Sequence, residues 1–426
     1  MSSPLAPDHT TTAGVRTDGR ARLTVLSGFW PSATFALARA LLADDPSLLL
    51  VRHELVDLRA GVVRRVVRTG TGIVEDEMVG LVHGCLSCTL REDVLPTLAR
   101  LTRTHPGQDL VLMLPETVEP EAVAEVCGHT LVDGAPITDR VHVDSYVTVV
   151  DAEHLLDGLA STDDLAGLGI QAADDDHRAL ADVLVRQIEY ADTLVLWGEG
   201  RYDGYDSAQL SVLLHRLAPW ATQLPVDEPY VDAGALARQL RHTDRHRPET
   251  PGVLARGIEG YLLGVHEPVP DCEIVSAVFR ARRPFHPGRL HELLAAVNAP
   301  VLRSRGVLWL ASQPDTAVAW EFAGGGLTLG SLGRWLVDVP DEGWAEASAQ
   351  RRLAAALNWD PYYGDRENYL VFIGFDLDPV ELHRVLAGCL LSDAELADGE
   401  AGWRHYPDPF AGCFPVPEPN SAGRTA

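Results

Sequence analysis

The sequence predicts an α/β protein with a mostly parallel sheet flanked by helices. Short apolar runs such as residues 110–114 alternate with segments such as residues 180–188, whose apolar side chains recur at helical spacing. The 426 residues can form two or three domains, and residues 241–256 contain prolines and few apolar side chains. We therefore expect a domain at residues 21–240, a linker, and a second domain at residues 257–408 that folds on its own.

Composition narrows the range of functions. The chain has 61 acidic and 35 basic residues, a formal net charge of −26, and all 35 basic residues are arginine. This negative charge opposes unassisted binding to nucleic acid or to an anionic membrane, so we expect neither as a partner. The absence of lysine excludes Schiff-base chemistry and any mechanism that requires a phosphate-binding lysine.

Several features indicate a cytoplasmic protein. No apolar run approaches the ~18 residues needed to span a membrane. Residues 1–20 are polar and lack the basic and apolar regions of a secretory signal, so we expect a disordered leader. Six cysteines in a long chain suit reduced thiols better than a disulfide scaffold. Residues 409–426 are rich in proline and glycine and are expected to form a loose tail.

The first elements follow the order strand, loop, helix. Residues 23–27 form an apolar strand, a loop begins at Gly28, and a helix continues through Leu37 and Leu41. That order is the context of a phosphate-binding loop, and a helix N-terminus can hold an anion. Further strands are expected at residues 48–51, 62–67, 72–77, 110–114, 146–151 and 193–196.

Two cysteines precede the next helix. Cys85 and Cys88 are separated by two residues, and apolar residues at helical spacing begin at Leu90. Thr89 can cap this helix, with Glu92 three residues later. Cys88 would then lie at a helix N-terminus, where the dipole and the free N–H groups favour the thiolate. A pair of thiolates suits zinc or Cu(I), or exchange with a disulfide.

His83 is a further candidate ligand. It lies two residues before Cys85, so both side chains share one face if a strand continues that far. A histidine that simply ends the strand and is satisfied by its surroundings is the alternative interpretation.

The cysteine motif resembles that of the CobW-type P-loop GTPases, a family of metal chaperones and metal-insertion proteins. The family motif reads Gly-Cys-x-Cys-Cys-Thr-x-Arg-x-Asp-Leu, and this chain reads Gly-Cys-Leu-Ser-Cys-Thr-Leu-Arg-Glu-Asp-Val from Gly84, with Ser87 in place of the middle cysteine. The resemblance extends over roughly residues 22–389. It implies a P-loop GTPase topology followed by a small α+β domain, zinc as the metal, and Glu54 as an acidic ligand.

The nucleotide motifs depart from the family pattern. The family loop Gly-Phe-Leu-Gly-x-Gly-Lys-Thr-Thr reads Gly-Phe-Trp-Pro-Ser-Ala-Thr-Phe-Ala here, starting at Gly28. Pro31 removes one N–H group, and no residue replaces the lysine. The resemblance leaves Gly28, Ser32, Thr34 and Glu116 as nucleotide contacts, the last from a Glu-Thr segment that faces the terminal phosphate in the family.

Two later motifs are also altered. The family's guanine-reading Asn-Lys-x-Asp becomes Trp-Gly-Glu-Gly at residues 197–200, without the aspartate. In the second domain, the family's Arg-x-Lys-Gly-x-x-Trp pattern runs from Arg303 to Trp309, with Arg305 in the position of the lysine.

The resemblance and the residues together predict a cytoplasmic, zinc-handling protein of the metallochaperone type. It would bind zinc through Cys85, Cys88, His83 and Glu54 and serve a metal-requiring client protein. Its degenerate nucleotide site would not hydrolyse GTP and would bind GTP and Mg²⁺ weakly at most, so no catalytic residue is assigned. Three alternatives stay open: an active GTP-hydrolysing metallochaperone, a pseudo-GTPase interaction scaffold, and a thiol redox protein.

Overall fold

The computed structural model of the protein describes residues 19–171, 173, 176–198, 204–227, 231–294 and 301–414. Residues 1–18 of the expected leader and residues 415–426 of the expected tail lie outside this description. The chain divides into two compact units: the first comprises residues 1–27, 31–147 and 230–248, and the second comprises residues 28–30, 148–229 and 249–426. Within the described part, no helix combines the length and the apolar character needed to cross a bilayer.

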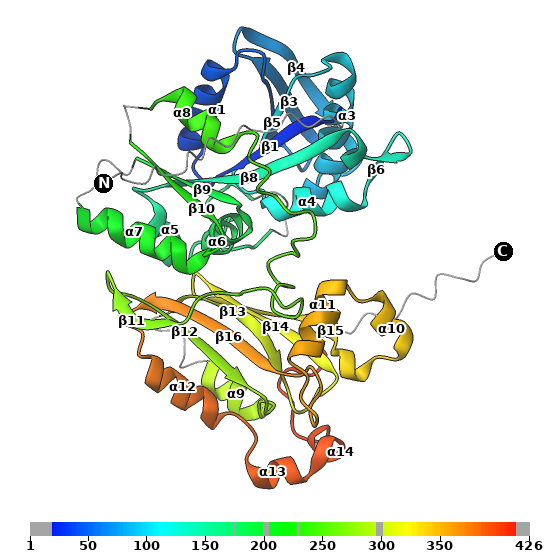
Figure 1. Ribbon diagram of the computed structural model, residues 1–426, viewed down its shortest axis with the longest axis vertical. Helices are drawn as coiled ribbons and strands as arrows, with labels where there is room; N and C mark the ends of the chain where they lie inside the picture. Colours follow the sequence, from blue (N-terminus) through cyan, green and yellow to red (C-terminus); the bar gives the residue numbers. More distant parts are fainter. Residues whose placement is uncertain are drawn as a thin grey trace, which may run out of the picture. The chain divides into compact units, whose positions relative to one another are not determined.

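The predicted α/β class is confirmed by an eight-stranded, mostly parallel sheet with the strand order β10-β9-β8-β1-β5-β2-β3-β4 (Figure 1). Its strands are β1 (Ala21–Ser27), β2 (Leu49–Asp57), β3 (Val62–Thr69), β4 (Gly72–Gly80), β5 (Leu110–Met113), β8 (Val141–Asp151), β9 (Thr193–Trp197) and β10 (Thr222–Val226). β5 pairs in parallel with β1 and β2, and β9 with β10, whereas β2, β3 and β4 form an antiparallel meander. All four side chains of β5 are buried, as expected for a strand inside a parallel sheet.

The first unit carries its helices around this sheet. They are α1 (Pro31–Asp44), α2 (Leu86–Cys88), α3 (Leu95–Thr104), α4 (Pro120–His129) and α8 (Ala233–Leu240), with a small hairpin of β6 (Leu131–Val132) and β7 (Ala135–Pro136). α8 packs beside α1 (Figure 1). α3 buries Leu95, Leu98 and Leu101, which recur every three residues and give the helix one apolar face.

The second unit contains α5 (Leu155–Ala160), α6 (Leu180–Tyr190), α7 (Gly204–Leu217) and a six-stranded antiparallel sheet, which confirms the predicted α+β domain. The strand order is β11-β12-β16-β13-β14-β15, formed by β11 (Glu267–Asp271), β12 (Ile274–Ala281), β13 (Val301–Trp309), β14 (Thr316–Ala323), β15 (Gly326–Arg334) and β16 (Asn368–Phe375). The helices of this part are α9 (Pro287–Leu294), α10 (Asp341–Glu346), α11 (Ala349–Leu357), α12 (Pro379–Gly388), α13 (Asp393–Ala397) and α14 (Gly399–Trp403).

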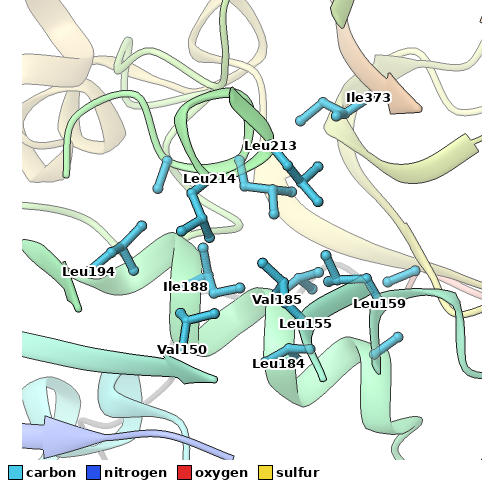
Figure 2. Close-up of a cluster of buried hydrophobic side chains, with 14 of the residues drawn as sticks. Val150, Leu155, Leu159, Leu184, Val185, Ile188, Leu194, Leu213, Leu214 and Ile373 are labelled. Atoms are coloured by element: carbon cyan, nitrogen blue, oxygen red, sulfur yellow. The ribbon is translucent and has the colours of Figure 1, made fainter. Parts of the chain in front are cut away.

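One hydrophobic core joins elements of the second unit that the sequence assigned to different domains. Ile188 of α6 and Leu213 of α7 belong to the same buried cluster as Ile373 of β16 (Figure 2). Tyr369 and Val371, also on β16, belong to it as well. The C-terminal sheet therefore shares its core with α6 and α7, which argues against the expectation that residues 257–408 fold alone.

A buried cluster of charged side chains lies in the same unit. Arg303 donates through Nε and Nη2 to both carboxylate oxygens of Glu189, each at 2.8 Å, and Nη2 also lies 2.8 Å from Glu321. Arg305 pairs with Glu189 too, and all four side chains are at most 5% exposed. Burial alone raises the pKa of Glu189, but the charges of Arg303 and Arg305 outweigh it and lower this pKa to about 2. The pattern that starts at Arg303 therefore has a structural role.

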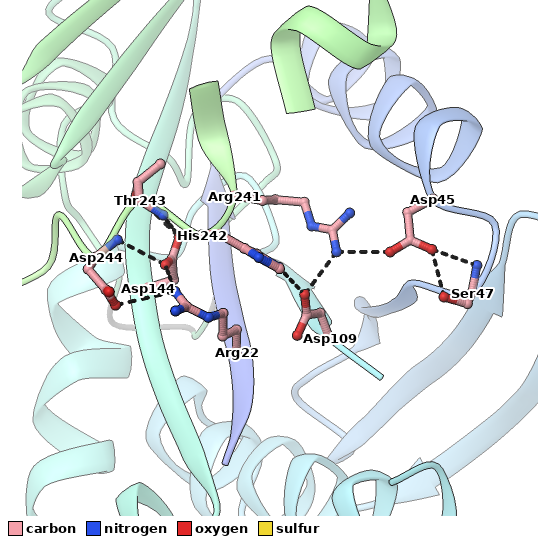
Figure 3. Close-up of polar contacts among 9 residues, drawn as sticks. All are labelled: Arg22, Asp45, Ser47, Asp109, Asp144, Arg241, His242, Thr243 and Asp244. Atoms are coloured by element: carbon pink, nitrogen blue, oxygen red, sulfur yellow. Dashed lines mark hydrogen bonds and ion pairs between the residues drawn. The ribbon is translucent and has the colours of Figure 1, made fainter. Parts of the chain in front are cut away.

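The expected linker begins as an integral part of the first unit (Figure 3). Nη2 of Arg241 lies 2.9 Å from the carboxylates of both Asp45 and Asp109. The carboxylate of Asp144 accepts a hydrogen bond from the backbone N–H of Thr243 at 3.1 Å. Because these carboxylates come from three distant positions in the sequence, the start of the stretch is fixed to the unit rather than free.

The described start of the expected tail is packed rather than loose. Phe410 and Phe414 are both buried and belong to a hydrophobic cluster with Phe285 and Leu386. Aromatic side chains recover enough apolar burial to order this segment despite its prolines and glycines. The expectation of a loose tail from residue 409 is therefore wrong for residues 409–414.

Candidate functional site

We call the segment from Cys85 to Cys88 the cysteine turn. Its short helix, α2, begins at Leu86, one residue after Cys85. Cys85 has an extended backbone (φ −144°, ψ 159°) and caps α2, because its Sγ accepts the backbone N–H of Cys88 at 3.2 Å. Thr89, expected as the cap, is buried instead, and its hydroxyl donates to the carbonyl of Cys85 at 3.0 Å. Cys85 rather than Thr89 therefore supplies the capping acceptor, so the helix starts earlier than predicted.

The protonation of Cys88 also differs from expectation. A hydrogen bond with Cys85, followed by burial and the negative charges of Cys85 and Glu92, raises the pKa of Cys88 to about 11. This direction opposes the expected effect of the helix N-terminus, which favours the thiolate. A soft metal ion can still displace the proton.

The helix that follows is irregular at its start. A π-helix at Thr89–Val94 connects α2 to α3, and the N–H of Leu95 bonds to the carbonyl of Leu90, five residues earlier. Such wide turns are rare and occur frequently at functional sites. The π-helix includes Asp93, whose side chain is buried.

Asp93 anchors this helix to the sheet. Its carboxylate lies 2.6 Å from Nε2 of His53 on β2 and pairs with Arg65 on β3. Arg65 also bonds Glu77 on β4 at 2.5 Å. Burial raises the pKa of Asp93, but the hydrogen bonds and charges of His53 and Arg65 outweigh it and lower the pKa below its usual value. Sequence reasoning missed this network, although Asp93 belongs to the quoted motif, because its partners lie on distant strands.

His53 lines a small cavity below the cysteine turn. Its side chain is 2% exposed, and Nδ1 has no hydrogen-bond partner in the described chain. The cavity has a volume of about 10 Å³, close to that needed for one water molecule. Leu86, Thr89 and Leu90 form part of its wall.

Glu54 and His83 are not brought to the cysteines as ligands. The carboxylate of Glu54 lies 2.9 Å from Arg52 and 3.3 Å from Arg64. His83 is exposed and lies in a bend, because the strand that was expected to carry it ends at Gly80. Across the described residues, no three His, Cys, Asp or Glu side chains are arranged to hold a metal ion.

A glycine explains how the cysteine turn packs. A Cβ atom on Gly84 would lie 1.8 Å from the carbonyl oxygen of Leu58. Only glycine permits this approach, so the turn lies directly against the connection between β2 and β3. The motif glycine thus fixes the position of Cys85 and Cys88.

The first unit holds part of the altered nucleotide motifs. α1 begins at Pro31, with Ser32 exposed and Thr34 buried. The guanidinium of Arg52 lies 4.0 Å from the centre of the Phe35 ring. Burial lowers the pKa of Arg52, and the nearby carboxylates of Glu54 and Glu116 only partly offset this. The negative charge of Glu116 is therefore close to the positive charge of Arg52.

The second unit holds the residues that precede Pro31. Gly28 and Phe29 are buried, and Phe29 belongs to the large hydrophobic cluster. Trp30 stacks on His154, with ring centroids 5.7 Å apart and an interplanar angle of 27°. Of the altered guanine-reading segment, Trp197 is buried at the end of β9, and residues 199–200 lie outside the described chain.

Family models match two parts of the chain. Residues 58–223 match the CobW/HypB/UreG nucleotide-binding domain, and residues 274–390 match the cobalamin synthesis protein cobW C-terminal domain. The first match begins after the loop that starts at Gly28 and includes the cysteine motif.

Two curated relatives match most of the chain. The zinc chaperone Rv0106 of Mycobacterium tuberculosis is 34% identical over 360 residues, which cover 82% of this chain and 84% of that protein. The zinc-regulated GTPase metalloprotein activator 1 of Dictyostelium discoideum is 29% identical over 394 residues, or 91% of this chain and 81% of that protein. The Zn(II)-bound YjiA GTPase from E. coli is similar at 15% identity and a TM-score of 0.37, over 87% of this chain and 99% of that one, which is too distant to place residues.

From the extent and sequence identity of these matches, the chain belongs to the zinc chaperone-like family whose members join a CobW/HypB/UreG nucleotide-binding domain to a cobW C-terminal domain.

Proposed function

We propose that this protein binds zinc as cargo at Cys85 and Cys88 and delivers it to a metal-requiring client protein in the cytoplasm. Relatives support this proposal by their names: one is a zinc chaperone, and another is a zinc-regulated activator of metalloproteins. The single observation that carries it is the turn itself. The 3.2 Å bond from the Cys88 N–H to the Cys85 Sγ holds both sulfur-bearing residues on one helical turn at the protein surface.

The donor set fits zinc in kind, although it is incomplete. Thiolates are preferred zinc ligands, and four ligands complete a structural zinc site. We propose that Glu54 and His83 complete the site when zinc binds. Glu54 would then have to leave Arg52 and Arg64, which opposes tight binding. A site that holds zinc weakly suits a protein whose task is to release it.

The nucleotide site is proposed to be degenerate and non-hydrolysing. The chain has no lysine, Phe35 stands where the family places an Mg²⁺-binding hydroxyl, and Arg52 lies against that ring. Phosphoryl transfer depends on the lysine and on the Mg²⁺-binding hydroxyl to stabilise developing charge. Weak binding of GTP and Mg²⁺ by Gly28, Ser32, Thr34 and Glu116 is retained as part of this proposal.

Zinc content tests the proposal. Titration of the purified, reduced protein against a chromophoric chelator should give one zinc per chain, and the double variant Cys85→Ser/Cys88→Ser should bind none. Cys413→Ser is the matched control, because Cys413 is an exposed cysteine of the other unit. Equal zinc content in the wild type and the double variant would contradict the proposal and favour the interaction scaffold.

Nucleotide turnover tests the second part. We expect no Mg²⁺-dependent GTP hydrolysis above background in the zinc-free or zinc-loaded protein. Turnover that survives purification and is lost in Arg52→Gln would reject the non-hydrolysing site and restore the active GTPase alternative.

A further inference from the structure

The second unit contains a cavity that the proposed zinc function does not use. Its volume is about 80 Å³, and it lies between the loop at residues 257–261, helix α11 and the strands β12, β13 and β16. Aromatic, apolar and charged side chains all contribute to its wall. A cavity that combines apolar walls with a few polar groups is the usual form of a small-molecule site.

The loop is held in place by close packing at a glycine. Gly260 has a φ of +77°, and a Cβ atom there would lie 2.2 Å from the Cβ of Ala354 on α11. This conformation and this contact both require glycine. The loop therefore touches α11 closely at one point, while the space beside it stays open.

Trp335 lines the cavity with an unsatisfied donor. Its side chain is 2% exposed, and its indole N–H has no hydrogen-bond acceptor in the described chain. Buried donors without a partner are rare in native proteins because the N–H loses its bonds to water without replacement. An acceptor supplied by a bound molecule accounts for this arrangement.

Arg280 provides a positive charge at the same cavity. Arg280 is an exposed residue of this wall, and its guanidinium lies 3.9 Å from the centre of the Tyr369 ring. The two acidic residues of the wall are already engaged. Asp365 accepts the backbone N–H groups of residues 336 and 337 at 2.8 and 2.9 Å, and Glu367 lies 4.0 Å from Arg282.

From the unpaired Trp335 N–H and the Arg280 guanidinium we propose that the cavity binds a small carboxylate. One carboxylate oxygen would accept the Trp335 N–H, and the negative charge would face Arg280. At about 10–15 Å³ for each water-sized position, the volume holds roughly five to eight non-hydrogen atoms. The apolar and aromatic walls then favour a short aliphatic monocarboxylate over a larger or multiply charged acid.

Binding to the full-length protein tests this site. Butanoate should bind saturably by calorimetry, and butanamide, its neutral counterpart, should bind at least tenfold more weakly. One indole N–H signal in the ¹H–¹⁵N spectrum should move downfield with butanoate. That signal should be absent in Trp335→Phe, a variant that keeps the aromatic packing.

Two arginine variants test whether butanoate binding depends on this cavity or on surface charge in general. Arg280→Gln should weaken butanoate binding at least tenfold, whereas Arg384→Gln should leave it unchanged, because Arg384 is exposed and pairs with Glu381 on α12. N-acetylglycine, compared with its amide, distinguishes a carboxylate that follows a peptide bond from a simple aliphatic acid. Equal affinity for butanoate and butanamide, unchanged affinity in Arg280→Gln, or no binding of any of these probes would overturn the proposal.

Discussion

The cysteine turn of the first unit and the charged cluster of the second unit both lie in sequence motifs that resemble the same family, yet they differ in environment. Cys85 and Cys88 are partly exposed, and the carboxylate proposed to complete their site is held by arginines. Arg303 and Glu189 are almost completely buried and satisfy each other. A motif can therefore mark the architecture of a protein as well as its chemistry, and burial distinguishes the two cases.

Removing Glu189 together with the helices α6 and α7 should have the largest effect on stability. The isolated fragment of residues 257–408 should not unfold cooperatively, because Arg303 and Arg305 would lose Glu189 and the β16 side chains would lose α6 and α7. Differential scanning calorimetry measures this directly. A fragment with a sharp transition would show that the shared core is dispensable.

Breaking the cluster within the intact chain should come next. Arg303→Ala leaves Glu189 buried without its main partner and should lower the free energy of unfolding by about 3–5 kcal/mol. Chemical denaturation gives the value. Arg384→Ala removes an exposed pair that solvent screens, so it should leave the free energy of unfolding almost unchanged. An equal loss of unfolding free energy in the two variants would contradict the difference that we draw between buried and exposed charges.

Weakening the contacts of Asp93 with His53 and Arg65 should lower the free energy of unfolding by less. Asp93→Asn weakens the bonds to His53 and Arg65 and should cost about 1–3 kcal/mol. Because the folded pKa of Asp93 is lowered, its stabilisation is complete above the ordinary value of 3.8 and is lost as the pH falls through the folded pKa. The stability difference between wild type and variant should therefore shrink below about pH 4. A difference that stays constant from pH 3 to pH 6 would exclude this role.

The last prediction concerns zinc binding rather than stability: zinc affinity should change with pH. Zinc must displace the proton of Cys88, whose pKa is about 11, so affinity should rise about tenfold per pH unit for this proton between pH 6.5 and 8.5. Ser87→Cys adds a thiolate ligand and should tighten binding at each pH. Chelator competition at three pH values measures both. Affinity that is independent of pH would remove Cys88 from the ligand set.

The sequence was sufficient for the fold class but not for the partners of buried charges. Alternating apolar periods and turn residues are local signals, and they predicted the mostly parallel sheet, whereas the family resemblance implied the α+β domain. The pairing of Arg303 with Glu189 spans 114 positions and has no local signal. The helix start was misplaced because a thiol and a hydroxyl are both acceptors, and only the backbone at Cys85 decides between them. His83 was placed on a strand that in fact ends at Gly80.

The separation of Arg303 from Glu189 has a consequence for protein synthesis. At about 5–20 residues per second, a ribosome makes Arg303 roughly 6–23 s after Glu189. β16, which lies between β12 and β13, is completed only at Phe375. The nascent chain therefore carries an uncompensated carboxylate and an open sheet edge during this interval, and the second unit can close only when nearly the whole chain has been made.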